Sequence, residues 1–183
     1  MINRISGILL FILLSPILGI VGIIIFVDDG MPILFTQKRL GLSGDIFNFY
    51  KFRTMKKDTP NIATHLLYNP EKYLLSFGKV LRKYSVDELP NLLNIIKGDM
   101  VFIGPRPALY NQEDLIQKRR VLGINKLKPG ITGWAQVNGR DKLNIPEKVK
   151  FDEYYFENRS FYLNLKILVM TIKQIFISKG MSH

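Results

Sequence analysis

"GILLFILLSPILGIVGIIIFVDDG", residues 7–30, is an apolar run with a Ser-Pro pair near its middle. Between Ile5 and Val27 the chain carries no charged residue, and a helix needs roughly 20 apolar residues to cross the hydrocarbon of a bilayer. By length alone, the run is able to span a membrane. We expect residues 1–27 to form a membrane segment and residues 28–183 to form one membrane-associated domain outside it.

The Ser15-Pro16 pair disturbs a regular helix. Pro16 has no backbone N–H, so the carbonyl of Ile12 loses its helical hydrogen bond and the proline ring bends the chain. The Ser15 hydroxyl is able to reach back to that carbonyl, so the helix can break while its polar groups stay satisfied. These residues leave two interpretations open: a kinked spanning helix, or a helix-turn-helix that enters the bilayer and turns back.

Length and composition constrain the rest of the chain. About 155 residues follow the apolar run, enough for one globular domain with a sizeable core. The formal net charge of +11 favours two anionic partners, membrane lipid and a phosphate-bearing substrate, with nucleic acid as the rival explanation. The chain contains no cysteine, which excludes disulfides, thiolate zinc sites and cysteine nucleophiles.

Local patterns predict an α/β fold that is mainly α with a small β-hairpin. Alternating aromatic and branched residues on both sides of "LSG", residues 42–44, predict the hairpin and place Lys51 and Arg53 on one of its faces. "VFIGPRP" predicts a brief buried strand that runs into a rigid loop. "KLKPGITGWAQVNGR" has no amphipathic period, so we expect a long ordered loop, and such loops usually carry function.

The spacing of apolar residues predicts the helices. In the second of them, Ser85 is expected to be the N-cap and Glu88 to complete a capping box, and the helix ends at Lys97-Gly98. The last predicted helix, residues 163–179, mixes apolar residues with lysines. This pattern fits core packing and also an interfacial amphipathic helix on anionic lipid. The predicted helices cover residues 77–84, 85–97, 111–123, a stretch from Pro146 onward, and 163–179.

The adjacent carboxylates Asp87 and Glu88 lie in the first turn of the second predicted helix, where the helix dipole favours anions. Two neighbouring carboxylates repel each other unless a cation lies between them. Mg²⁺ prefers oxygen ligands and is usually held by one or two carboxylates plus substrate phosphates. The pair therefore fits a nucleotide-phosphate site, although Glu88 as a capping residue beside an Asp87 that only complements the dipole is the simpler interpretation.

Several basic residues favour the phosphate-site interpretation of this pair over the capping interpretation. Arg82 precedes Asp87 by five residues, Arg106 lies in the stiff "GPRP" loop and Arg140 ends the "QVNGR" loop. Planar guanidinium groups bind phosphate oxygens in pairs. Lys51, between two aromatic residues, is a further candidate for a phosphate contact or a cation–π contact.

Several blocks of this chain occur in the order found in the bacterial sugar transferases, the monotopic phosphoglycosyl transferases. They are "SPI" in the apolar run, "KFRTM", "SVDELPNLLNIIKGDM", "GPRP", "KPGITGWAQVNGR" and "KFDEYY". The chain resembles this family from its first helix to its last and looks like the minimal form. Val86 and Asn91 stand where Leu and Gln are commoner in the family, which leaves the assignment intact.

The resemblance implies an Mg²⁺-dependent enzyme that moves a sugar 1-phosphate from a UDP-sugar to a polyprenol (undecaprenyl) phosphate, releasing UMP. Asp87 would be the nucleophile, a metal ligand and the carrier of a covalent phosphosugar. Glu88 would handle the proton, while Lys51, Arg82, Arg106 and Arg140 would bind substrate. The sugar, the carrier length and the glycan pathway are not encoded in any motif, and a homo-oligomer is compatible with the sequence.

The resemblance also implies that the Ser15-Pro16 helix is re-entrant. Both of its ends would then stay on the cytoplasmic face of the bacterial inner membrane, together with the catalytic domain. One rival is a non-catalytic, membrane-tethered basic protein that binds nucleic acid or anionic lipid, supported by the +11 charge alone. A nucleotidyl transferase ranks lower, because the chain has no Gly-rich phosphate loop with a following Lys and Ser or Thr.

Overall fold

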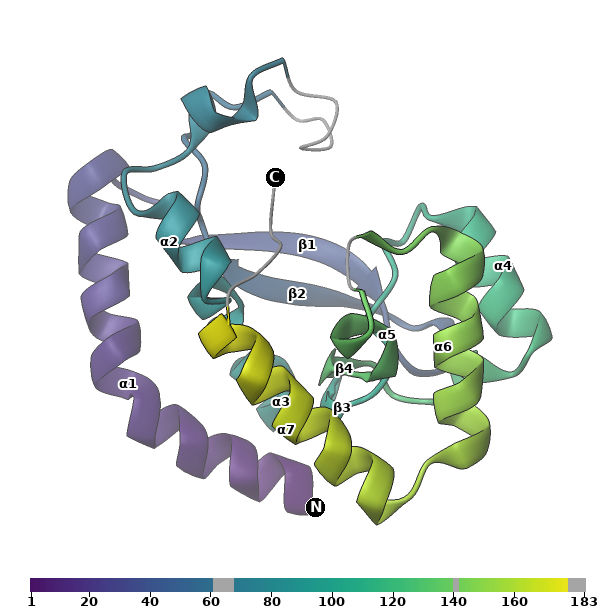
Figure 1. Ribbon diagram of the computed structural model, residues 1–183. Helices are drawn as coiled ribbons and strands as arrows, with labels where there is room; N and C mark the ends of the chain where they lie inside the picture. Colours follow the sequence, from purple (N-terminus) through teal and green to yellow (C-terminus); the bar gives the residue numbers. More distant parts are fainter. Residues whose placement is uncertain (61–67, 140–141, 178–183) are drawn as a thin grey trace.

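The computed structural model describes residues 1–60, 68–139 and 142–177 (Figure 1). It is mainly helical with two small sheets, which confirms the predicted mainly α composition of an α/β fold. With η for a 3₁₀ helix, the elements are α1 (Ile2–Asp29), β1 (Leu34–Leu40), η1 (Leu42–Gly44), β2 (Ile46–Phe52), η3 (Pro70–Tyr73), α2 (Gly78–Lys83), η4 (Val86–Asn91), α3 (Leu92–Lys97), β3 (Val101–Ile103), α4 (Glu113–Val121), η5 (Ile124–Lys126), β4 (Gly130–Thr132), α5 (Trp134–Val137), α6 (Ile145–Asn158) and α7 (Phe161–Ile177).

The apolar run forms one continuous helix, α1, with Pro16 inside it. The Ser15 hydroxyl donates to the carbonyl oxygen of Ile12 at 2.8 Å, which confirms the expected substitute for the missing backbone hydrogen bond. Figure 1 shows α1 changing direction near its middle, so the expected turn is a bend within one helix. Within the described residues, this is the one helix long and apolar enough to cross a membrane.

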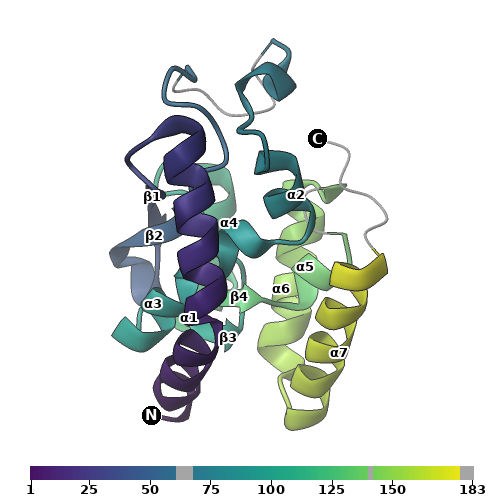
Figure 2. The same cartoon turned by 90° about the vertical axis from the view of Figure 1, so that its left-hand side faces the viewer.

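One side of α1 packs against the domain. Val21 and Ile25 join Phe52 in one core cluster, and Phe11 packs against a second cluster that contains Ile95. The helix lies along the outside of the molecule in both views (Figures 1 and 2). Its large exposed apolar residues are Ile2, Ile5, Ile8, Leu9, Ile12, Leu13, Ile17, Ile20, Ile23, Phe26 and Val27. An exposed apolar surface of this extent is typical of a membrane contact.

Strands β1 and β2 form the predicted antiparallel hairpin, in which Leu34 lies opposite Phe52. Ser43 has a φ of 56° in the connecting turn, a left-handed conformation that a short polar residue tolerates better than a branched one. Lys51 and Arg53, which were expected on one face, contact different elements. Lys51 approaches η4, and Arg53 lies just after the strand and approaches the end of α1.

The predicted capping box at Ser85 is wrong. Ser85 has a left-handed φ of 56° and makes no side-chain capping hydrogen bond. Residues Val86–Asn91 form a 3₁₀ helix, and α3 starts only at Leu92. Pro90 explains the delay, because it lacks the N–H that an α-helix starting at residue 86 would need at that position. The helix ends as predicted at Gly98, whose φ is 94°.

A second sheet lies where the sequence predicted only one strand and a loop. β3 pairs in parallel with β4, and α5 follows, so part of "KLKPGITGWAQVNGR" is regular structure. A side chain at Gly130 or Gly133 would collide with the backbone of Gly104. These glycines therefore permit close contact between two backbone segments, and strands of three residues are too short to show a period in the sequence.

Helices α4, α6 and α7 complete the domain, with α4 and α6 adjacent in Figure 1. The N-cap of α4 is Gln112 instead of the expected Asn111. α6 begins at Ile145, one residue before the prediction, with a capping box between Asn144 and Glu147 that the prediction missed. The predicted last residue of α7, Lys179, lies outside the described residues.

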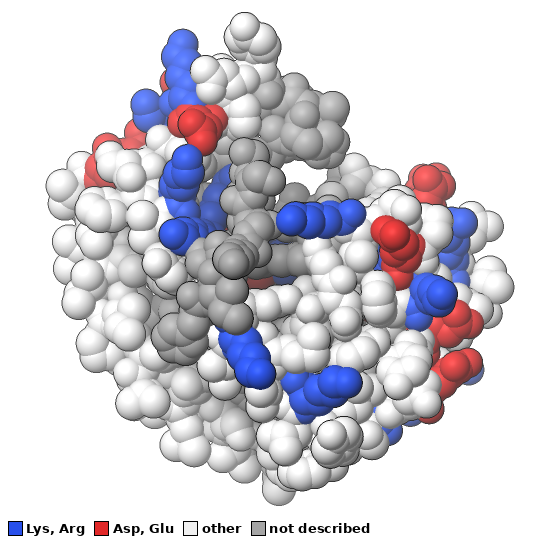
Figure 3. Space-filling view, in the orientation of Figure 1, with Lys and Arg blue, Asp and Glu red and all other residues white. Residues whose placement is uncertain are grey.

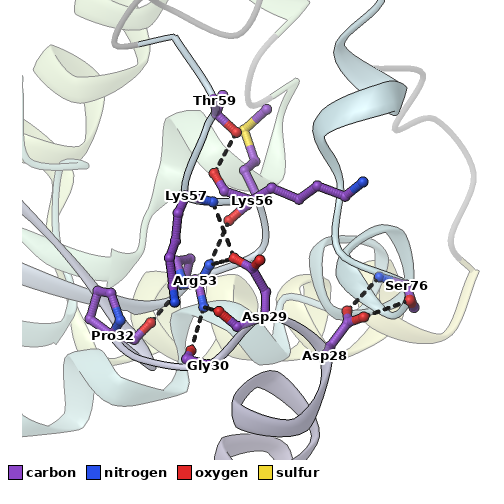
Figure 4. Close-up of polar contacts among 10 residues, drawn as sticks. Asp28, Asp29, Gly30, Pro32, Arg53, Lys56, Lys57, Thr59 and Ser76 are labelled. Carbon is purple, nitrogen blue, oxygen red and sulfur yellow. Dashed lines mark hydrogen bonds and ion pairs between the residues drawn. The ribbon is translucent and has the colours of Figure 1, made fainter.

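The C-terminal end of α1 is bound to the domain by its two aspartates (Figure 4). Asp28 accepts hydrogen bonds from the backbone N–H and hydroxyl of Ser76 at 2.8 and 2.9 Å. Arg53 is buried, forms an ion pair with Asp29 and donates to the carbonyl oxygen of Gly30 at 2.6 Å. Carboxylates at a helix C-terminus oppose the helix dipole, and the Arg53 guanidinium offsets that cost.

The N-terminal end of α1 is bound as well. Arg4 donates to the carbonyl oxygen of Lys97, the last residue of α3, at 2.8 Å. Three residues later, Gly7 is buried, and a Cβ there would lie 3.0 Å from Ile95. Both ends of the apolar helix therefore contact the same domain.

Replacing Arg53 with alanine is expected to lower the free energy of unfolding by about 1–3 kcal/mol, because buried carbonyl acceptors lose a charged donor. The effect is measured by thermal or denaturant unfolding of the nanodisc-embedded protein. Lys79→Ala is the control, because the Lys79–Glu71 ion pair is exposed on both sides and should contribute nothing measurable. Equal effects of the two substitutions would contradict an anchoring role for Arg53.

Candidate active site

Two adjacent carboxylates lie in the first turn of η4. The side chains belong to Asp87 and Glu88, and the residues are only 6% and 7% exposed. A buried carboxylate keeps its charge only where cations or hydrogen-bond donors replace water. The surrounding side chains therefore decide what this pair is able to do.

Glu88 is held by two cations from different parts of the chain. Arg106, in the loop after β3, donates to Oε2 at 3.1 Å through Nη1 and to Oε1 at 2.6 Å through Nη2. Lys51 of β2 lies 3.2 Å from Oε1. The fold thus brings together Lys51, Glu88 and Arg106, three of the residues selected from sequence, and the two-pronged arginine contact fixes the orientation of the carboxylate.

The Lys51 ammonium is itself in an unusual environment. Burial lowers the pKa of Lys51, and the negative charge of Glu88 opposes that shift. The Lys51 Nζ also lies 5.6 Å from the centre of the Phe49 ring, a cation–π contact with an aromatic residue other than the two that flank Lys51. The side chain combines an ion pair with an aromatic neighbour, and 21% of its surface is exposed.

Arg82, in α2, is the basic residue that interacts with Asp87. Its Nε donates to the Thr54 hydroxyl at 2.8 Å. Burial lowers the pKa of Arg82, and the charge of Asp87 opposes the shift, which places the guanidinium within the electrostatic field of that carboxylate. Thr54, 5% exposed, was not selected from sequence, because a threonine after a strand has no signature of its own.

Arg140 lies outside the described residues, so its expected contact with a substrate phosphate stays a prediction. Ser15 and Pro16 lie within α1, where the Ser15 hydroxyl bonds to the carbonyl oxygen of Ile12.

Sequence reasoning missed a buried ion pair behind the Arg106 loop. Arg119 of α4 and Asp152 of α6 are 9% and 1% exposed. Asp152 shares helical spacing with Val149 and Tyr155, so an acidic residue on an apolar stripe was a usable signal. Arg119 lies in a run of basic residues, a pattern that is typical of an exposed helix face and gave no signal of burial.

Basic side chains are prominent on one face of the molecule. In Figure 3, lysine and arginine side chains lie on several sides of the middle of this face, whereas many of the acidic side chains lie over α4 and α6. Such a distribution favours the approach of a polyanion such as a nucleotide sugar or a lipid phosphate.

The donor set fits a metal ion that is shared with a substrate. Among the residues that the structure describes, no group of three or more histidine or acidic side chains is assembled to hold a metal. Mg²⁺ is usually bound by one or two carboxylates plus phosphate oxygens. Asp87 offers one such carboxylate, whereas both oxygens of Glu88 already accept hydrogen bonds from Arg106, and phosphates would complete the set.

The chain is similar to known sugar transferases. The family model "Bacterial sugar transferase" matches residues 1–178. "Uncharacterized sugar transferase EpsL" of Bacillus subtilis is 42% identical over 154 residues, which are 84% of this chain and 75% of that protein. "Exopolysaccharide production protein ExoY" of Rhizobium meliloti is 32% identical over 184 residues, covering 92% of this chain and 81% of that protein.

A third relative is longer. "UDP-glucose:undecaprenyl-phosphate glucose-1-phosphate transferase" of Escherichia coli is 34% identical over 180 residues, which cover 94% of this chain but only 39% of that protein. This chain therefore matches less than half the length of that relative. With a match from the first residues to α7, the chain belongs to the bacterial sugar transferase family.

Proposed function

We propose that this protein transfers a sugar 1-phosphate from a UDP-sugar to a polyprenol phosphate such as undecaprenyl phosphate, giving polyprenol diphosphate sugar and UMP. This would be the first membrane step in the assembly of a glycan. The observation that carries the proposal is the buried Asp87-Glu88 pair, with Arg106 and Lys51 bound to Glu88. Relatives named as undecaprenyl-phosphate glucose and N-acetylgalactosamine phosphotransferases support the substrate class.

In the first half-reaction, a carboxylate oxygen of Asp87 attacks the β-phosphorus of the UDP-sugar. The bond from that phosphorus to the bridging oxygen breaks, and UMP leaves with the bonding electrons. The sugar phosphate is then esterified to Asp87. Carboxylates serve as nucleophiles at phosphorus when cations neutralise the phosphate oxygens, and Lys51, Arg82 and Arg106 bring that charge to the site.

In the second half-reaction, a phosphate oxygen of the lipid acceptor attacks the same phosphorus, and Asp87 is the leaving group. Glu88 lies next to Asp87 and is positioned by Arg106, so it would accept the proton of the acceptor phosphate where one is present. The two adjacent carboxylates thus have separate roles, set by their contacts.

We expect Mg²⁺ to be required, with Asp87 as its protein ligand, because both oxygens of Glu88 already accept hydrogen bonds from Arg106. When bound, the metal would supply positive charge against the diphosphate oxygens. Arg140, which follows Gly139, stays a proposed phosphate ligand on the resemblance alone.

We further propose that α1 enters the bilayer and returns, so that the domain lies on the cytoplasmic face of the inner membrane. Arg4 binds α3 at one end of the helix, and Asp28 binds Ser76 at the other. A straight spanning helix would place these ends on opposite sides of the membrane, where one domain could not bind both. The bend at Pro16 is what makes the alternative geometry accessible.

The last helix, α7, supports contact of the domain with the membrane. Leu163 and Ile167 of α7 are buried, so the core-packing interpretation is correct for one face. The opposite face is apolar and exposed, which supports the proposal that it rests at the lipid interface. Its large exposed residues are Phe161, Tyr162, Leu165, Leu168, Val169 and Ile172. A nucleic-acid-binding protein without catalysis, the rival function, has no support from the family match.

The covalent step predicts a burst of UMP. Purified enzyme given a panel of UDP-sugars without acceptor should release at most one equivalent of UMP and retain the sugar phosphate. Asp87→Asn should abolish both, while Glu88→Gln should still be labelled and transfer the label slowly. Asp45→Asn, an exposed carboxylate on the hairpin turn, is the control. UMP release that requires acceptor, with no trapped adduct, would instead indicate direct transfer.

The lowered pKa of Lys51 predicts an alkaline limit of activity below the pH at which an ordinary lysine loses its charge. If a charged Lys51 is needed, kcat/KM should fall as pH rises through its lowered pKa, because the neutral amine no longer offsets phosphate charge. Lys51→Arg stays charged and should move that limb to higher pH, whereas exposed Lys56→Arg should not. If the alkaline fall in kcat/KM occurs at the same pH in Lys51→Arg, the group that titrates is not Lys51.

Topology is tested by labelling a cysteine at position 2 in membrane vesicles of both orientations. The native chain has no competing thiol. Ile2→Cys should react only from the cytoplasmic side, like the control Asp45→Cys. Replacing both Ser15 and Pro16 with leucine should restore a straight helix and move residue 2 across the membrane. Labelling of the otherwise unchanged protein from the outside would contradict re-entry.

A further inference from the structure

The buried Arg119–Asp152 ion pair lies outside the proposed reaction centre, between the adjacent helices α4 and α6 (Figure 1). Two nitrogens of Arg119 donate to Oδ2 of Asp152, Nε at 3.0 Å and Nη2 at 2.5 Å. Burial raises the pKa of Asp152, and the Arg119 charge opposes the shift. Ion pairs this buried often add little to stability, since desolvation offsets much of their attraction.

The same guanidinium has a third contact, and it points to the proposed active site. Nη1 of Arg119 donates to the backbone carbonyl oxygen of Arg106 at 2.8 Å. Arg106 is the residue whose side chain holds both oxygens of Glu88. A line of direct contacts therefore runs from Asp152 through Arg119 and Arg106 to Glu88.

The loop that carries Arg106 is held at every carbonyl from residue 105 to residue 108. The donors are the Gly130 N–H to Pro105 at 3.0 Å, Arg119 to Arg106 at 2.8 Å, Arg39 to Pro107 at 2.7 Å and the Leu40 N–H to Ala108 at 3.0 Å. Prolines on both sides of Arg106 restrict φ, so the direction of the intervening peptide is set mainly by such contacts. Of these donors, Arg119 is the one whose own side chain is held in place by a buried carboxylate, that of Asp152.

We propose that Arg119, locked by Asp152, is a positioning residue that sets the backbone at Arg106 and thereby aims the Arg106 guanidinium at Glu88 and the substrate phosphates. Arg119 acts through Arg106 and touches no reacting group. The inference rests on the proposed function, in which Arg106 stabilises phosphate charge. A displacement of about 1 Å at such a group is able to cost on the order of 10²-fold in rate.

The test compares Arg119→Lys with Arg120→Lys, its exposed neighbour on the same helix. Lysine keeps the charge but cannot bond to the Asp152 carboxylate and the Arg106 carbonyl in the same fixed geometry. In nanodiscs with undecaprenyl phosphate and the active UDP-sugar, we expect Arg119→Lys to lower kcat about 10–100-fold, with KM for the UDP-sugar within about threefold of wild type. Arg120→Lys should match wild type.

A double-mutant cycle separates positioning from a general structural role. If Arg119 acts through Arg106, its substitution in an Arg106→Lys background should lower kcat by less than about threefold more. Asp152→Asn, which keeps the shape of the side chain, should behave in the same way and serves where Arg119→Lys folds poorly. Losses that multiply, or a wild-type kcat in folded Arg119→Lys, would overturn the proposal.

A second readout does not depend on turnover. In Arg119→Lys, amide hydrogen exchange should accelerate at Gly130 and Leu40, whose N–H groups bind the same loop, but not in the middle of α1. Unchanged exchange at these amides would contradict the positioning role. A wild-type chain that releases no UMP from any UDP-sugar would contradict the proposed function instead, and the exchange result still decides the role of Arg119.

Discussion

Burial of two adjacent carboxylates is the constraint on which the rest of this structure depends. Asp87 and Glu88 are each less than a tenth exposed, and two negative charges in such a place require positive partners. The partners come from the hairpin, as Lys51, and from the loop after β3, as Arg106. The hairpin, η4 and the parallel strand pair must therefore converge on one point, and the short sheets serve mainly to bring them there.

The apolar helix α1 is integrated into this arrangement. Side chains from its inner face enter the same core clusters as Phe52 of the hairpin and Ile95 of α3. α3 directly follows η4, so the element that carries the carboxylates continues into one that packs on α1. This arrangement keeps the candidate site at a fixed position relative to the apolar surface, which suits chemistry between a soluble nucleotide sugar and a lipid phosphate.

Predictions from the sequence succeeded where a pattern was strong and local. The Ser15 hydrogen bond, the hairpin and the end of α3 at Gly98 follow from short-range rules, and the structure confirms them. The capping box at Ser85 failed, because Pro90 favours a 3₁₀ helix over a regular start of α3. The parallel strands were missed because three-residue strands have no readable period and are stabilised by a partner distant in the chain.

The sequence by itself determined the family, the apolar helix with its bend, and a set of charged residues suited to phosphate chemistry. Tertiary structure alone decided which charges meet. Arg106 lies on Glu88, whereas Arg119, in an ordinary-looking basic run, turns inward to Asp152. The physical reason is that an ion pair depends on distance in space, and contacts between residues far apart in the chain leave no periodic trace in either segment.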